Sequence, residues 1–128
     1  MADLKEKILK LDEYLGKQRF DWTDKIKELT VNLKKGVQLE EVSAYTLSYR
    51  QILVEQLASM CNRMRAQKVV VDQKYKQKWI EYYQYDYKLT DKQLFALLET
   101  QKSFIEASVK TLDNMGFAIK NRLDMSRI

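Results

Sequence analysis

The chain has 128 residues, a formal net charge of +5, one cysteine, three glycines and neither histidine nor proline. Without histidine it lacks the commonest metal ligand and general base, one cysteine builds no zinc site, and no GxxxxGK[ST] phosphate loop occurs. We therefore expect no enzyme and no cofactor. The single Cys61 can form no internal disulfide, so we expect a protein of the reducing cytoplasm. No apolar run approaches membrane-span length and the start lacks a signal-peptide core, so we expect no membrane partner.

The first third of the chain predicts two short amphipathic helices. Asp3 and Glu6 form a capping pair that opens the first helix, and Gly16 would end it. The second helix is predicted from about Asp21 to Lys35, with Gly36 behind it. The apolar residues of both helices recur at helical spacing: Leu4, Ile8, Leu11, Leu15, Trp22, Ile26, Leu29 and Leu33. Helices this short must dock on the rest of the chain.

A long central helix is predicted from Leu39 to about Tyr83, because this stretch contains neither glycine nor proline and keeps near-helical apolar spacing. The segment YQYDYKL that follows alternates like a strand but is too short to found a sheet. We interpret it as the end of the helix and a connector.

Thr90 and Gln93 form the capping pair of a C-terminal helix that reaches nearly to Ile128. Its apolar residues follow a seven-residue repeat, which is typical of helix-on-helix packing. The partner helix can belong to the same chain or to another subunit, since both use the same spacing. The apolar cluster near the C-terminus favours self-association, and the candidate oligomerisation residues are Leu98, Ile105, Leu112, Met115, Phe117 and Ile119.

Positive charge is concentrated in residues 62–80, where six cations face one acid, so the remainder of the chain is neutral overall. The stretch KYKQKWIEYYQYDYK, which overlaps it, holds six of the fourteen aromatic residues. Cations meet phosphates and rings stack on bases, so this pattern favours sequence-independent binding of single-stranded nucleic acid. The candidate binding residues are Arg63, Arg65, Lys68, Lys74, Lys76, Lys78, Trp79 and Tyr83. The alternative is a helical coiled-coil scaffold or adaptor, in which the tyrosines pack in the core and the lysines only solubilise.

Three stretches of the chain resemble the UvsY family of recombination mediator proteins of T-even-like phages. MGFAIKNRLDM, at residues 115–125, is similar to the family's C-terminal end, where a GFAIK block precedes a DM pair. LTVNLKKGV, at residues 29–37, resembles the family's N-terminal helix, and KQKWIEYY, at residues 76–83, resembles its DNA-contacting segment. The first twenty or so residues have no clear counterpart, and QYDYKL replaces the family's glycine-rich connector.

The resemblance implies an all-α, elongated subunit with a long central helix and a C-terminal oligomerisation helix. Residues 1–88 would form an N-terminal helical region that carries the DNA-binding segment, and residues 89–128 would form the oligomerisation helix. It also implies a homo-oligomeric ring of about six to eight subunits in the host cytoplasm. The implied partners are single-stranded DNA, the phage single-strand-binding protein that coats it, and the RecA-type phage recombinase that is loaded onto it.

Overall fold

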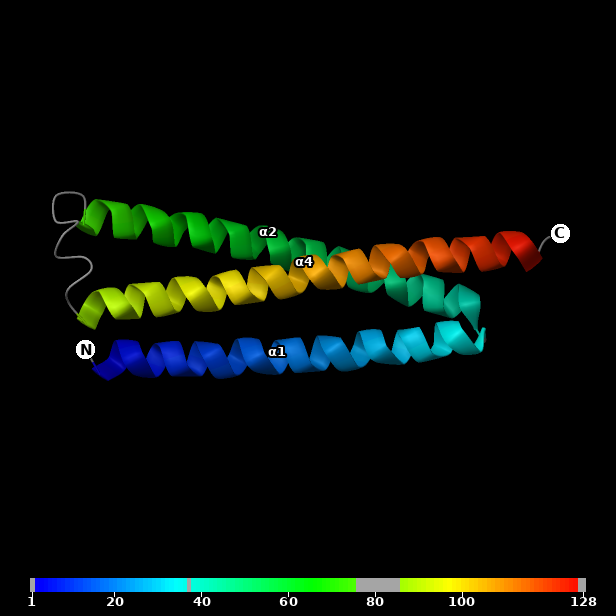
Figure 1. Cartoon of the computed structure of the whole chain (residues 1–128), viewed down its shortest axis with the longest axis horizontal. Coiled ribbons are helices and arrows are strands. Elements are labelled where there is room, and N and C mark those ends of the chain that lie inside the picture. The colour runs from blue at the N-terminus through cyan, green and yellow to red at the C-terminus, as the bar shows by residue number, and fades with distance from the viewer. Residues whose placement is uncertain (1, 37, 76–85, 127–128) are drawn as a thin grey trace.

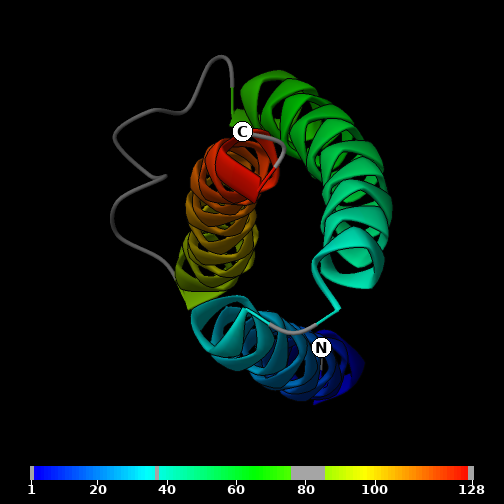
Figure 2. The ribbon, with the colours of Figure 1, turned by 90° about the vertical axis from the view of Figure 1, so that its right-hand side faces the viewer.

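Three long helices form an elongated bundle in this computed structural model, which describes the backbone of residues 2–36, 38–75 and 86–126. They are α1 (Ala2–Lys35), α2 (Leu39–Tyr75) and α4 (Asp86–Ser126), and the described residues contain no strand. Helices α1 and α4 run in one direction and α2 runs back (Figure 1). Seen along its length, the bundle places the helices around a common axis (Figure 2), and the predicted all-α class is confirmed.

Helix α1 is one continuous helix and not two, so the predicted break at Gly16 is wrong. Glycine inside a helix costs only about 1 kcal/mol relative to alanine. The buried side chains of Leu15 and Trp22, on either side of Gly16, offset that cost by packing on the other helices. Asp3 and Glu6 also lie inside α1, which already includes Ala2, and so they do not mark its start.

The sharp turn between α1 and α2 begins at Gly36, as predicted. Gly36 has a φ of 68°, a left-handed conformation that glycine adopts without steric cost, and its N–H donates to the carbonyl of Leu33 at 3.1 Å. The guanidinium of Arg122, on α4, donates to the same carbonyl. A cation at the C-terminal end of a helix is favourable, so Arg122 ties the end of α4 to the end of α1.

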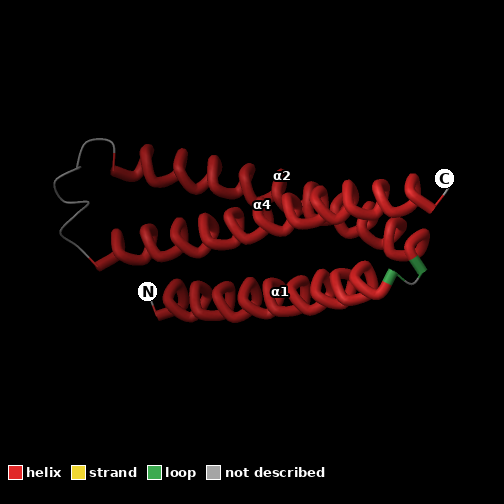
Figure 3. The backbone as a smooth tube through the Cα atoms, turned by 45° about the vertical axis from the view of Figure 1, so that its right-hand side comes forward, coloured by secondary structure: helices red, strands yellow, loops and turns green. Residues whose placement is uncertain are grey.

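Helix α4 begins at Asp86, before the predicted start at Thr90. Thr90 and Gln93 therefore lie inside a helix, and their capping pattern is a chance match. The boundary expected after residue 88 also falls inside α4, which packs along both other helices. Of the predicted central helix, residues 39–75 are helical as expected, and residues 76–83 lie outside the described residues (Figure 3).

The seven-residue repeat of α4 faces the core of its own chain. Five of the six candidate oligomerisation residues are at most 7% exposed: Leu98, Ile105, Leu112, Met115 and Ile119. Helices α1 and α2 cover them, so they are not free to pair with another subunit while the bundle is intact. Of the two kinds of partner that the repeat allowed, a helix of the same chain accounts for these five. Phe117, at 69% exposed, is the sixth and remains available at the surface.

The core consists of two apolar clusters. The large cluster lies toward the turn between α1 and α2 and contains Trp22, Ile26, Leu29, Val42, Leu53, Ile105, Leu112, Met115 and Ile119. The small cluster lies toward the other end of the bundle and contains Leu15, Met60 and Leu98. Between the clusters, each helix contributes a polar side chain that is buried or half-buried, and we call Arg19, Gln56 and Gln101 the polar layer.

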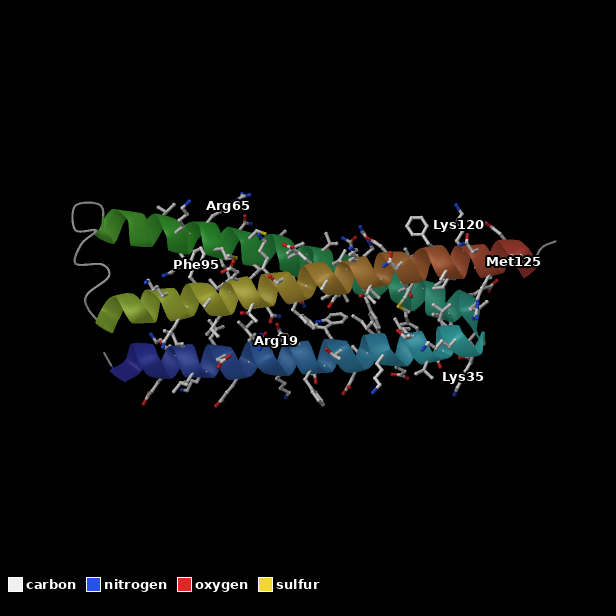
Figure 4. The ribbon with its side chains drawn as sticks, viewed as in Figure 1. Arg19, Lys35, Arg65, Phe95, Lys120 and Met125 are labelled. Carbon is white, nitrogen blue, oxygen red and sulfur yellow. The ribbon has the colours of Figure 1, made fainter. Side chains whose placement is uncertain are left out.

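Gln101 is the centre of the polar layer, with an exposed fraction of 0%. Nη1 of Arg19 donates to its Oε1 at 2.9 Å, and Figure 4 shows Arg19 between α1 and α4. Nε2 of Gln101 and Oε1 of Gln56 are both buried without a hydrogen-bond partner. A donor and an acceptor therefore remain unpaired in the same layer, which is a cost that natural cores usually avoid.

Candidate nucleic-acid interface

The described part of the basic segment lies on the C-terminal half of α2. Arg63, Arg65 and Lys68 are all exposed, and Figure 4 shows Arg65 directed away from the bundle. None of the three has an ion-pair or hydrogen-bond partner among the described residues. At about 100° per residue, Arg63 and Lys68 flank the stripe of buried Met60 and half-buried Met64 on opposite sides, and Arg65 points outward. These cations are therefore free to meet phosphates.

The rest of the predicted site follows Lys68 in the sequence. Lys74 lies in the last turn of α2. Lys76, Lys78, Trp79 and Tyr83 lie outside the described residues, so their place in the site stays a prediction. The structure thus brings three of the eight candidate residues to one exposed end of α2. Phosphate contacts from such flexible cations are independent of sequence, since base edges are not read.

A second aromatic cluster, outside the predicted binding segment, lies between α1 and α2. The rings of Trp22 and Tyr49 meet edge to face with centroids 5.4 Å apart, and Tyr45 and Tyr49 are 5.8 Å apart. Nζ of Lys25 lies 4.9 Å from the centroid of the Trp22 ring, in a cation–π contact. Tyr45 is 47% exposed beside a hollow of about 290 Å³.

This hollow is a poor site for DNA despite its rings. Glu28 and Glu41 line it, and Lys25 is its one lysine. Two carboxylates repel phosphate, and Lys25 already faces the rings. The sequence alone places Glu41 near Tyr45, because the two are four residues apart on α2. It does not reveal Glu28, which comes from α1. The basic end of α2 remains the better candidate.

The described residues contain no group of three or more histidine, cysteine, aspartate or glutamate side chains that could hold a metal ion. Within the same residues, no helix combines the length and the apolar character that crossing a membrane requires. Comparison of the chain with models of protein families, with curated proteins and with solved structures found no match. The candidate nucleic-acid interface is therefore supported by the residues of this chain alone.

Proposed function

We propose that this protein is a recombination mediator, which binds single-stranded DNA and helps to load a RecA-type recombinase onto strands coated by single-strand-binding protein. The main observation in support of DNA binding is the concentration of positive charge in one segment of the chain. The whole net charge of +5 resides in residues 62–80, and Arg63, Arg65 and Lys68 expose its first part without competing acids as partners. The resemblance of three stretches to UvsY proteins supports the loading step.

Binding through this surface is electrostatic and sequence-independent. Each phosphate that a lysine or arginine neutralises releases condensed counterions, so the affinity falls as the salt concentration rises. The aromatic residues after Tyr75 would add stacking, which tolerates any base. A subunit with a few such contacts binds weakly, and the proposed ring would multiply them along one strand. A strand held in this way is presented to the recombinase while the coating protein leaves.

Assembly of the ring needs a surface other than the seven-residue repeat of α4, because that repeat is buried inside the chain. The outer side of α4 is the remaining candidate on this helix. Phe117 there is a large apolar side chain that is 69% exposed. Large exposed apolar side chains that gather in a patch mark contact surfaces more often than single ones do.

The triple variant Arg63→Ala, Arg65→Ala, Lys68→Ala is expected to weaken binding of single strands of every sequence alike. With about 0.7 units of slope per phosphate contact, the slope of log affinity against log salt should become shallower by about 2. The measurement is fluorescence anisotropy of labelled oligonucleotides of two compositions over a series of salt concentrations. A second triple variant on α1, Lys27→Ala, Lys34→Ala, Lys35→Ala, loses the same charge at exposed positions and is the control.

Equal losses in the two triple variants would mean that only net charge matters, and would contradict a site on α2. If the parent protein shows no salt-dependent binding at all, the scaffold alternative replaces the mediator. Loading is tested separately, by the rate at which a RecA-type recombinase displaces labelled single-strand-binding protein with and without this protein. An unchanged rate with intact DNA binding would remove the loading step alone.

A further inference from the structure

An apolar groove of about 500 Å³ runs between α2 and α4 on the outside of the bundle. Leu47 of α2, 66% exposed, and Phe117 of α4, 69% exposed, stand on its two sides. The fully buried Leu112 and the buried Thr46 close its floor. Two large apolar side chains beside one hollow make a patch and not a scattered pair, which is the kind of surface that a partner covers.

Gly116 opens this groove. It lies well inside α4, where glycine is unfavourable relative to alanine, and its φ is not left-handed. A Cβ added to Gly116 would meet nothing within 4 Å. The fold of the single chain therefore does not need a glycine here, although the helix is weaker for having one. The space above Gly116 suits close approach by a side chain or helix from outside.

The charges beside the groove are arranged in a complementary way. Asp113 lies three residues before Gly116, and Lys120 lies three residues after Phe117. Residues at these spacings share one face of a helix. The carboxylate of Asp113 accepts from Nε of Arg50 at 2.5 Å but is still 42% exposed, so it can accept a second donor. Lys120 is exposed, without an acidic partner among the described residues, and Figure 4 shows it on the outer side of α4.

We infer that this face binds a second copy of the chain, with the two α4 helices antiparallel about a twofold axis that passes between residues 116 and 117. Phe117 of each copy then enters the partner's groove above Gly116, beside Leu47. The same axis brings Asp113 of each copy opposite Lys120 of the other, because both pairs are centred on the same point. The same twofold rotation therefore places the phenyl group of Phe117 in the partner's groove and Asp113 opposite the partner's Lys120. This is the self-complementarity that an isologous contact requires.

This contact uses the outer side of α4, the surface named above as a candidate for assembly, and it does not depend on the DNA-binding or loading step of the proposed function. A twofold contact closes when two copies have met, so by itself it makes a dimer. A larger ring needs a second surface and would be built from an even number of subunits. A dimer already doubles the basic segments available to one strand, if DNA is the ligand. The contact exists in the absence of DNA, so its test uses the protein alone.

Two charge reversals test the axis directly. Lys120→Asp places two pairs of carboxylates opposite each other in the dimer, and Asp113→Lys places two pairs of amines opposite each other. Each single variant is expected to raise the dissociation constant of the dimer by about 100-fold or more. Mixed in equal amounts, the two variants restore both ion pairs in a heterodimer. The double variant Asp113→Lys, Lys120→Asp restores them within one chain type and should also dimerise.

The measurement is multi-angle light scattering of the full chain, with circular dichroism to show that each variant stays helical. The expected result is an even number of subunits for the parent, the double variant and the mixture, and half that number for each single variant. A monomeric parent overturns the inference. So does a single variant that assembles like the parent, or a mixture that fails to reassemble.

Gly116→Leu provides a second test that does not alter charge. The Cβ of the new side chain meets no atom within 4 Å, the rest of the side chain extends into the groove, and leucine favours the helix. We expect a subunit at least as stable as the parent that no longer dimerises. Gly16→Ala is the matched control, since it removes the other glycine inside a helix, where an added Cβ makes only ordinary contact with Arg19 at 3.6 Å. Retained assembly in Gly116→Leu contradicts the inference.

Discussion

Ile105→Ala is expected to lower the free energy of unfolding by about 2–5 kcal/mol. Ile105 is 1% exposed within the large cluster, and it belongs to the seven-residue repeat that first suggested contact between subunits. Because its neighbours Leu53 and Leu112 are fully buried and come from two helices, the space left by the removed methyl groups cannot be filled by water or by a small local shift. The loss should therefore be felt by each subunit separately.

Urea denaturation followed by circular dichroism measures this loss, and it should be repeated over a range of protein concentrations. If Ile105 stabilises the subunit, the loss is independent of concentration. If it stabilises an assembly, the midpoint of the parent rises with concentration and the difference between parent and variant grows with it. Asn114→Ala, at an exposed position nine residues along the same helix, is the control and should change the stability by less than about 0.5 kcal/mol.

Gln101→Leu is expected to raise the free energy of unfolding by about 1–3 kcal/mol, although it removes a hydrogen bond. The buried Nε2 of Gln101 has no acceptor, so the amide is desolvated without full compensation. Leucine has a similar volume and would join the two apolar clusters between Leu98 and Ile105. The guanidinium of Arg19, which is only half-buried, can turn to water when its acceptor is gone.

Chemical denaturation of the variant measures the sign as well as the size of this effect. Gln51→Leu is the control, because Gln51 is exposed and pairs only with Glu55, at 3.1 Å. We expect less than about 0.5 kcal/mol for that change. A Gln101→Leu protein that is less stable than the parent would mean that the amide of Gln101 is fully hydrogen-bonded in solution, and would contradict the expectation. In that case the layer would stabilise the bundle as well as fix the register of its helices.

Much of the fold followed from periodicity in the sequence. The buried residues at positions 98, 105, 112 and 119 were predicted from their spacing, as was the turn at Gly36. The partner of the repeat could not be predicted, since helices of one chain and of two chains use the same spacing. The break at Gly16 failed because a lone glycine weakens a helix by less than the packing of its neighbours strengthens it. A capping pattern such as that of Thr90 is informative only where a helix happens to begin.

The candidate sites were predictable to different degrees. The concentration of cations in residues 62–80 is visible in the sequence, and the exposure of Arg63, Arg65 and Lys68 agrees with it. The groove beside Phe117 could not be predicted from the sequence, because Leu47 and Gly116 line it from two helices that come together only in the folded bundle. In the sequence, Gly116 is noticeable only as part of the GFAIK block. That it opens a groove on the surface follows only from the packed structure, in which an added Cβ would meet nothing within 4 Å.

From the separation of the core into two clusters by the polar layer, we expect the two ends of the bundle to open separately. The large cluster has nine buried side chains and the small cluster has three, so exposing the small cluster costs less free energy. Local opening of this kind is what amide hydrogen exchange detects. Amides near Leu15, Met60 and Leu98 should exchange through openings that leave the large cluster intact. The basic segment begins at this end, so the helical end that would meet a DNA strand can fray and close again while the remainder of the subunit stays folded.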